Sequence, residues 1–215
     1  SLRNHLFWIF LAMVLSCSDR IETQLQRFLL RGNDMAAKQN FTEAKRLFRE
    51  AIGLDSCFAE GWNNLGTIYY KEKHFPEAIQ SYSRAIECRP DFESALLHRS
   101  NTYYEINMLD AALRDLTAYS AINSDTSILF FSSALIHTRM EKYDTAIALF
   151  EQALERDPQN AEIMTNIGIV YYFKADFDSA RKVLHHALEM KPDQPNVFNT
   201  LALIEAESGN PDGAL

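Results

Sequence analysis

The stretch Trp62–Tyr70, WNNLGTIYY, has the spacing of an amphipathic helix, yet it places two asparagines and a glycine in the helix interior. Both residue types are weak helix formers, because Asn competes for backbone hydrogen bonds and Gly loses the most backbone entropy on folding. These residues must therefore have a role in packing or binding that outweighs their cost to the helix. The sequence 34 residues before and after this stretch indicates that role.

Alanines recur every 34 residues along the chain without an insertion or deletion, at Ala44, Ala78, Ala112, Ala146, Ala180 and Ala214. A second series of small residues lies twelve positions before each alanine, at Gly32, Gly66, Ser100, Ala134, Gly168 and Ala202. A constant period of this length indicates stacked copies of one supersecondary unit. We expect each copy to pack closely where its side chains are small and to bury its apolar face against the next copy.

The pattern Trp62-x-x-Leu65-Gly66-x-x-Tyr69, together with the 34-residue period, resembles the tetratricopeptide repeat. The resemblance covers residues 25–215 and implies an all-α fold: an α-solenoid of about 5.5 antiparallel helix pairs wound into a right-handed superhelix. The expected repeats are 25–58, 59–92, 93–126, 127–160 and 161–194, followed by a partial sixth repeat or capping helix over 195–215. In the third repeat Tyr119 and Ser124 depart from the pattern, which we interpret as family variation rather than a designed bend.

In the family that the chain resembles, the first helix of each pair lines a concave groove, so Gly66 is interpreted as a packing contact and Asn63 and Asn64 as groove residues. Side-chain amides both donate and accept hydrogen bonds, which suits recognition of an extended peptide, and tyrosines add rigid contact area. The alternative is a solvated polar helix surface. The candidate groove residues are Asn33, Asn63, Asn64, Thr67, Tyr70, His98, Asn101, Tyr104, Phe131, Arg139, Asn166 and Tyr172.

A clamp for the C-terminal carboxylate of heat-shock chaperones is one specific form of such a groove. Asn33 and Asn64 match the two asparagines of that clamp, but Leu29, Ser94 and His98 occupy its basic positions. Without fixed cations a bound carboxylate loses its charge-assisted hydrogen bonds. The sequence therefore predicts a partner other than a chaperone tail.

The N-terminus differs from the repeats. Arg3 is followed by ten apolar residues over 6–15, too short to cross a bilayer as a helix, and then by Ser16 and Cys17. This layout is typical of a secretory signal, and residues 14–17 resemble the lipobox of bacterial lipoproteins, in which the cysteine is lipidated. We expect a signal-like segment over 1–17, a linker over 18–24 and a location on the periplasmic side of a bacterial membrane. The alternative is a cytoplasmic protein in which the segment packs on the first repeat or occupies the groove.

Cys57 and Cys88 are the other two cysteines of the chain. A disulfide is possible in an oxidising compartment, but two cysteines without a repeated close spacing are weak evidence for one. Because unpaired cysteine is among the most buried residue types, we interpret both as buried free thiols.

Charge and motif content limit the possible functions. A net charge of −8 and a pI near 5.3 argue against nucleic acid, whose phosphates need clustered Lys and Arg. The sequence has no His-Glu-x-x-His, Cys-x-x-Cys, phosphate loop or nucleophile elbow, so we expect no enzyme activity, cofactor or metal. The predicted function is a non-catalytic scaffold that binds a partner peptide or helix in the groove, anchored as a lipoprotein through Cys17. The alternatives are a non-catalytic domain of a larger enzyme or secretion machine, and a cytosolic adaptor.

Overall fold

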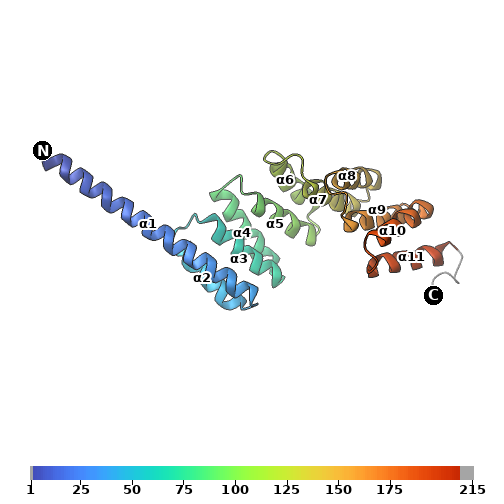
Figure 1. Cartoon of the computed structure of the whole chain (residues 1–215), viewed down its shortest axis with the longest axis horizontal. Helices are drawn as coiled ribbons and strands as arrows, with labels where there is room; N and C mark the ends of the chain where they lie inside the picture. The colour runs from blue at the N-terminus through green and yellow to red at the C-terminus, as the bar shows by residue number, and fades with distance from the viewer. Residues whose placement is uncertain (1, 209–215) are drawn as a thin grey trace. The chain divides into compact units, whose positions relative to one another are not determined.

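The computed structural model describes residues 2–208, with side chains from Asp19 onward, and over this range it contains eleven α-helices and no strand (Figure 1). The expected all-α fold is confirmed. The helices are α1 Leu2–Ala37, α2 Phe41–Leu54, α3 Ala59–Lys71, α4 Phe75–Cys88, α5 Glu93–Glu105, α6 Leu109–Ser120, α7 Ser127–Arg139, α8 Tyr143–Arg156, α9 Ala161–Phe173, α10 Phe177–Met190 and α11 Pro195–Glu207.

The chain divides into two compact units, Ser1–Ile106 and Asn107–Leu215. Unit 1 holds α1 to α5 and unit 2 holds α6 to α11. The boundary falls inside the third expected repeat, 93–126, so the two helices of that repeat belong to different units.

A single left-handed residue lies in the middle of the connection between the two helices in each of the first five repeats. In the second repeat the amide of His74 donates to the carbonyl of Tyr69 and the amide of Lys73 donates to that of Tyr70, both at 2.9 Å. This pair of bonds satisfies the last carbonyls of α3 and reverses the chain, so that α4 returns antiparallel to it. The left-handed residues have φ between 59° and 61° and are themselves 34 apart: Gln39, Lys73, Asn107, Glu141 and Ala175.

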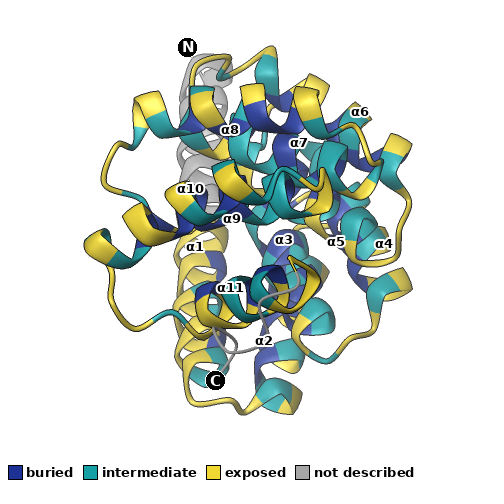
Figure 2. Ribbon diagram, turned by 90° about the vertical axis from the view of Figure 1, so that its right-hand side faces the viewer, coloured by how far each residue is buried: buried dark blue, intermediate teal, exposed yellow. Residues whose placement is uncertain are grey.

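The alanine series lies at the centre of the helix pairs. All five alanines within the described range are completely buried, and Ala44, Ala146 and Ala180 lie in clusters of buried apolar side chains. Figure 2 shows buried residues on the helix faces that meet other helices, and exposed residues along the connecting loops. Within the units, the helix pairs α1–α2, α3–α4, α7–α8 and α9–α10 are therefore held by apolar burial, as the period predicts. The buried alanines are Ala44, Ala78, Ala112, Ala146 and Ala180.

The contact made by Gly66 differs from the expected one. A Cβ atom at this position would lie 2.7 Å from the ring of Tyr82, so the glycine makes room for an aromatic ring of α4 rather than for Ala78. In the fifth repeat Gly168 faces Leu184 in the same way, at 2.5 Å. Each of these glycines thus sets how deeply a large side chain of the second helix enters the pair.

The N-terminal helix α1 runs without a break from residue 2 to 37, so residues 18–24, expected to form a linker, are helical. The expected lipidation site Cys17 lies outside the residues whose side chains the structure describes. Where side chains are described, no helix combines the length and the apolar character needed to cross a lipid bilayer.

Cys57 and Cys88 form a disulfide, with their Cα atoms 5.2 Å apart. The interpretation of the two residues as buried free thiols is wrong: Cys57 is exposed in the connection between α2 and α3, and Cys88 is partly exposed at the end of α4. One cysteine precedes the second repeat and the other ends it. Antiparallel pairing of α3 and α4 brings these two ends together, although 31 residues separate them in the sequence.

The sixth repeat is represented by one described helix, α11. Val197 and Ile204 are completely buried, whereas Phe198 and Leu203 leave about half of their surface exposed, 52% and 50%. Residues 209–215, which include Ala214, lie outside the described part of the chain.

Candidate partner-binding groove

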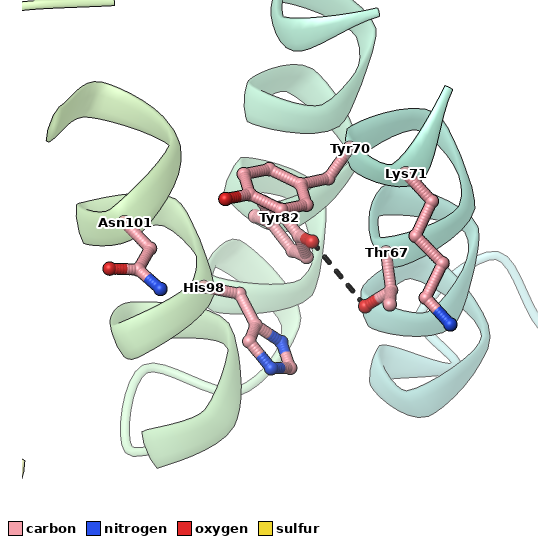
Figure 3. Close-up of a pocket in the computed structure, with 6 residues that line it drawn as sticks. All are labelled: Thr67, Tyr70, Lys71, Tyr82, His98 and Asn101. Carbon is pink, nitrogen blue, oxygen red and sulfur yellow. Dashed lines mark hydrogen bonds between the residues drawn. The ribbon is translucent and has the colours of Figure 1, made fainter. Parts of the chain in front are cut away.

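A pocket of about 200 Å³ opens on unit 1 between α3, α4 and α5 (Figure 3). Helix α3 and helix α5, which are the first helices of two successive repeats, supply five of its six lining residues. Its position agrees with a groove lined by first helices. The lining residues are Thr67, Tyr70, Lys71, Tyr82, His98 and Asn101.

Tyr82 forms the back of this pocket. The residue is 1% exposed, and its hydroxyl donates to Oγ1 of Thr67 at 3.3 Å, as the dashed line in Figure 3 marks. The Thr67 hydroxyl in turn donates to the carbonyl of Asn63 at 3.1 Å. Burial raises the pKa of Tyr82 to about 12, so the phenol is neutral and acts as a donor. Because Gly66 leaves room for this ring, the glycine of the opening stretch positions one wall of the pocket.

A chain of side-chain hydrogen bonds crosses the first helices of unit 1. Nδ1 of His98 on α5 lies 3.0 Å from Oδ1 of Asn63 on α3. The Asn63 amide donates to Oδ1 of Asn64 at 3.1 Å, and the Asn64 amide donates to Oδ1 of Asn33 on α1 at 2.8 Å. We call these four residues the amide chain. It ties α1, α3 and α5 together along one face of unit 1.

His98 is neutral and has a fixed tautomer. Burial lowers the pKa of its imidazole, so the ring carries no charge near pH 7. The Asn63 carbonyl oxygen can only accept, so Nδ1 of His98 carries the proton and Nε2 keeps a lone pair. The ring lies 5.5 Å from that of Tyr82, measured between centroids. At this wall the pocket offers an acceptor and aromatic surface rather than a cation.

The amide chain changes the role expected for two asparagines. Asn63 is only 6% exposed, and both Asn63 and Asn64 use their amides on neighbouring side chains. They hold the first helices in place. Tyr70, Lys71 and Asn101 form no hydrogen bond or ion pair with other described residues, so their polar groups are open to a partner. Burial, and to a smaller extent the charge of Glu105, raises the pKa of Tyr70, which keeps its phenol neutral as well.

Comparison with known proteins assigns the repeated segments to a family. Family models described as "Tetratricopeptide repeat" match residues 59–92 and 138–204. These segments are tetratricopeptide repeats. The segment 59–92 contains the stretch Trp62–Tyr70. It supplies four residues to the pocket lining: Thr67, Tyr70, Lys71 and Tyr82.

The other similarities concern longer proteins or the fold alone. Hsp70-Hsp90 organizing protein 3 of Arabidopsis thaliana is 28% identical over 159 residues, which are 70% of this chain but only 28% of that protein. A tetratricopeptide repeat protein from Parabacteroides merdae superposes with a TM-score of 0.79 at 17% identity, covering 89% of this chain and 76% of that one. YrrB, described as a tetratricopeptide repeat protein with an unusual peptide-binding site, gives 0.66 at 19% identity, covering 80% and 89%. At these identities the structures show a shared tetratricopeptide fold.

The remaining predicted groove residues lie outside the pocket. Tyr104 is partly buried on α5. In unit 2, Phe131 on α7 and Asn166 on α9 line two further hollows, and Arg139 is exposed at the end of α7. The hydroxyl of Tyr172 donates to the carboxylate of Glu207 at 2.7 Å. The structure therefore gathers only part of the predicted set at one site.

The sequence interpretation missed Tyr82 as a groove residue because it lies on a second helix, where side chains were expected to fill the core. A signal was present in the repeat. At the equivalent position the other repeats carry Phe or Leu, and only this one carries a hydroxyl: Phe48, Tyr82, Leu116, Phe150 and Leu184.

Proposed function

We propose that this protein is a non-catalytic scaffold that binds an extended segment of a partner protein along the face of unit 1 formed by the first helices α3 and α5. The observation that carries the proposal is the pocket itself, in which predicted groove residues of two successive repeats meet. The amide chain holds the three first helices before a partner arrives, and such preorganisation lowers the entropic cost of binding.

The pocket suits one anchoring side chain of the bound segment. Its rings offer an apolar wall, while Lys71 and Asn101 stand at the lining with open polar groups. A buried aromatic or aliphatic anchor surrounded by polar contacts is the usual arrangement of an energetically dominant contact. The backbone of the segment would then bond the amide of Asn101 and the phenol of Tyr70.

We do not propose a chaperone tail as the partner, although the similar Arabidopsis protein is named for Hsp70 and Hsp90. At the positions where a carboxylate clamp needs cations, this chain has Leu29, Ser94 and a neutral His98. A carboxylate placed there would lose solvation without gaining a charge-assisted hydrogen bond.

The pocket can be tested without a known partner by selecting binders from a phage-displayed peptide library against the full chain. Tyr70→Ala with Asn101→Ala should weaken the selected peptides about tenfold or more, since truncating a central tyrosine removes a large share of binding energy. The matched control is Tyr103→Ala with Gln80→Ala, again one tyrosine and one side-chain amide, at positions that do not line the pocket. If the pocket variant binds the selected peptides as tightly as the control does, the proposed site is wrong.

We further propose that the scaffold is exported and held at the periplasmic face of a bacterial membrane by a lipid on Cys17. The support is the lipobox-like sequence at residues 14–17 together with the Cys57–Cys88 disulfide, because exposed disulfides persist in oxidising compartments. Several acyl chains, as bacterial lipoproteins carry, make such anchoring lasting where a single chain would not.

The anchor is tested by fractionating cells that express the wild type or Cys17→Ala. We expect the wild type in the membrane fraction and the variant in the soluble extracellular or periplasmic fraction, with a lipid mass on the wild-type N-terminus alone. Equal distribution of both proteins in the cytosol would favour the cytosolic adaptor instead.

A further inference from the structure

The net negative charge of the chain comes entirely from unit 2. Unit 1 has 13 Lys and Arg against 13 Asp and Glu, so it is neutral, whereas unit 2 has 8 against 16, which accounts for the entire net charge of −8. A field of this kind attracts positively charged partners to unit 2 and repels phosphate groups and anionic lipid surfaces. The two units therefore suit partners of different chemistry.

Two hollows lie beside each other along the first helices of unit 2 and share Glu162 of α9. One, of about 270 Å³, lies between α7 and α9 and is lined by Phe131, Ile128 and Asp157 among others. The other, of about 340 Å³, lies between α9 and the start of α11 and includes Asp193. We call the pair the acidic hollows. They form a continuous lining on three successive repeats.

The carboxylates of the acidic hollows form no ion pair with the described residues, although Lys191 also lines the hollow between α9 and α11. Asp157 accepts a hydrogen bond from the Asn160 amide at 2.7 Å, but among the described residues no Lys, Arg or His nitrogen lies within 4.0 Å of Asp157, Glu162 or Asp193. Elsewhere in unit 2, by contrast, Arg156 and other cations hold carboxylates in ion pairs. The described side chains contain no group of three or more His, Cys, Asp or Glu arranged to hold a metal ion.

Apolar side chains share the lining of the hollows with these carboxylates. Ile128 is 46% exposed at the rim, and Phe131 and Ile169 are partly buried within the lining. The lining thus offers apolar contact between negative charges, which is complementary to a chain in which Lys or Arg alternates with aliphatic residues.

We propose that the acidic hollows of unit 2 bind a basic, partly apolar segment of a protein partner, at a site separate from the unit 1 pocket. The carboxylates of Glu162 and Asp193 pair with Lys or Arg side chains of the segment, and an aliphatic side chain enters beside Phe131. The proposal extends the scaffold function to a second partner segment, and it can fail while the unit 1 site stands.

The test measures fluorescence anisotropy of two labelled twelve-residue peptides on the full chain. Both peptides have the same aliphatic residues, with Lys at the charged positions in one and Glu in the other. We expect the Lys peptide to bind and the Glu peptide to bind at least about tenfold more weakly at low salt. Glu162→Gln with Asp193→Asn should weaken the Lys peptide about fivefold, as expected for removing two exposed charges, and added salt should reduce the difference.

The matched control is Glu151→Gln with Glu189→Gln, which removes the same charge from exposed positions outside the hollows. An equal loss in both variants would mean attraction to the whole unit and would overturn the site. So would equal binding of the two peptides, or loss of the Lys peptide in the unit 1 variant Tyr70→Ala with Asn101→Ala. A dimer in analytical ultracentrifugation that Glu162→Gln with Asp193→Asn dissociates would show a second copy as the occupant instead.

Discussion

Replacing Cys57 and Cys88 with serine should lower the free energy of unfolding by about 3 to 4 kcal/mol, the chain-entropy value for a bond that closes a loop of roughly thirty residues. The disulfide joins the residues before α3 to the end of α4. We therefore expect most of the loss in stability to come from unfolding of the second repeat. Urea denaturation followed by circular dichroism measures the total. Hydrogen exchange should show the largest loss of protection in α3 and α4.

The repeat itself offers a control for this cross-link. Asp125 and Arg156 occupy the equivalent positions two repeats later, are also 31 residues apart, and form an ion pair. Cys57→Asp with Cys88→Arg would transfer that pair to the second repeat. Because an exposed ion pair contributes only about 0 to 1 kcal/mol, the transferred pair should recover a small part of the loss. If the wild type unfolds at the same urea concentration with and without reductant, the disulfide does not stabilise this repeat.

The regular part of the fold could be predicted because residues at equivalent positions of the repeats are buried in the same way. The alanines that the period singles out are completely buried, and the second expected repeat, 59–92, contains α3 from Ala59 and α4 to Cys88. Burial requires the same small or large residue at the same position in every copy, so one sequence already holds several independent observations of each position.

The features that the sequence analysis did not predict occur in a single repeat or unit. The disulfide uses two residues that no other repeat shares, and the period says nothing about such a pair. The family resemblance implied the face on which Asn63 and Asn64 lie, but whether they bond a partner or each other depends on distances of a few tenths of an ångström. The net charge of −8 does not reveal the neutral and acidic units, because the boundary between them falls inside a repeat and follows from the fold.

A second large effect on stability is expected at Gly66, the glycine of the stretch Trp62–Tyr70. Gly66→Ala should destabilise the protein by about 1 to 2 kcal/mol through overpacking, even though alanine is the better helix former. The added methyl group would lie 2.7 Å from the Tyr82 ring, and this ring cannot retreat without leaving the core of the helix pair. The fourth repeat carries Ala134 at the equivalent position against Phe150, both completely buried, so the expected cost is that of shifting α4 and not complete unfolding.

Gly53→Ala provides the matched control, because a Cβ atom there would meet nothing within 4 Å. The same substitution in α2 should therefore stabilise the protein by up to about 1 kcal/mol through backbone entropy alone, giving opposite signs at two helical glycines. Thermal and urea unfolding of the two variants measure the difference. Since a displaced Tyr82 also loses its bond to Thr67, Gly66→Ala should weaken peptides selected for the unit 1 pocket, whereas Gly53→Ala should not. Equal stability of the two variants would mean that the second repeat adjusts its helix spacing freely, and the pocket wall would then owe its position to something other than Gly66.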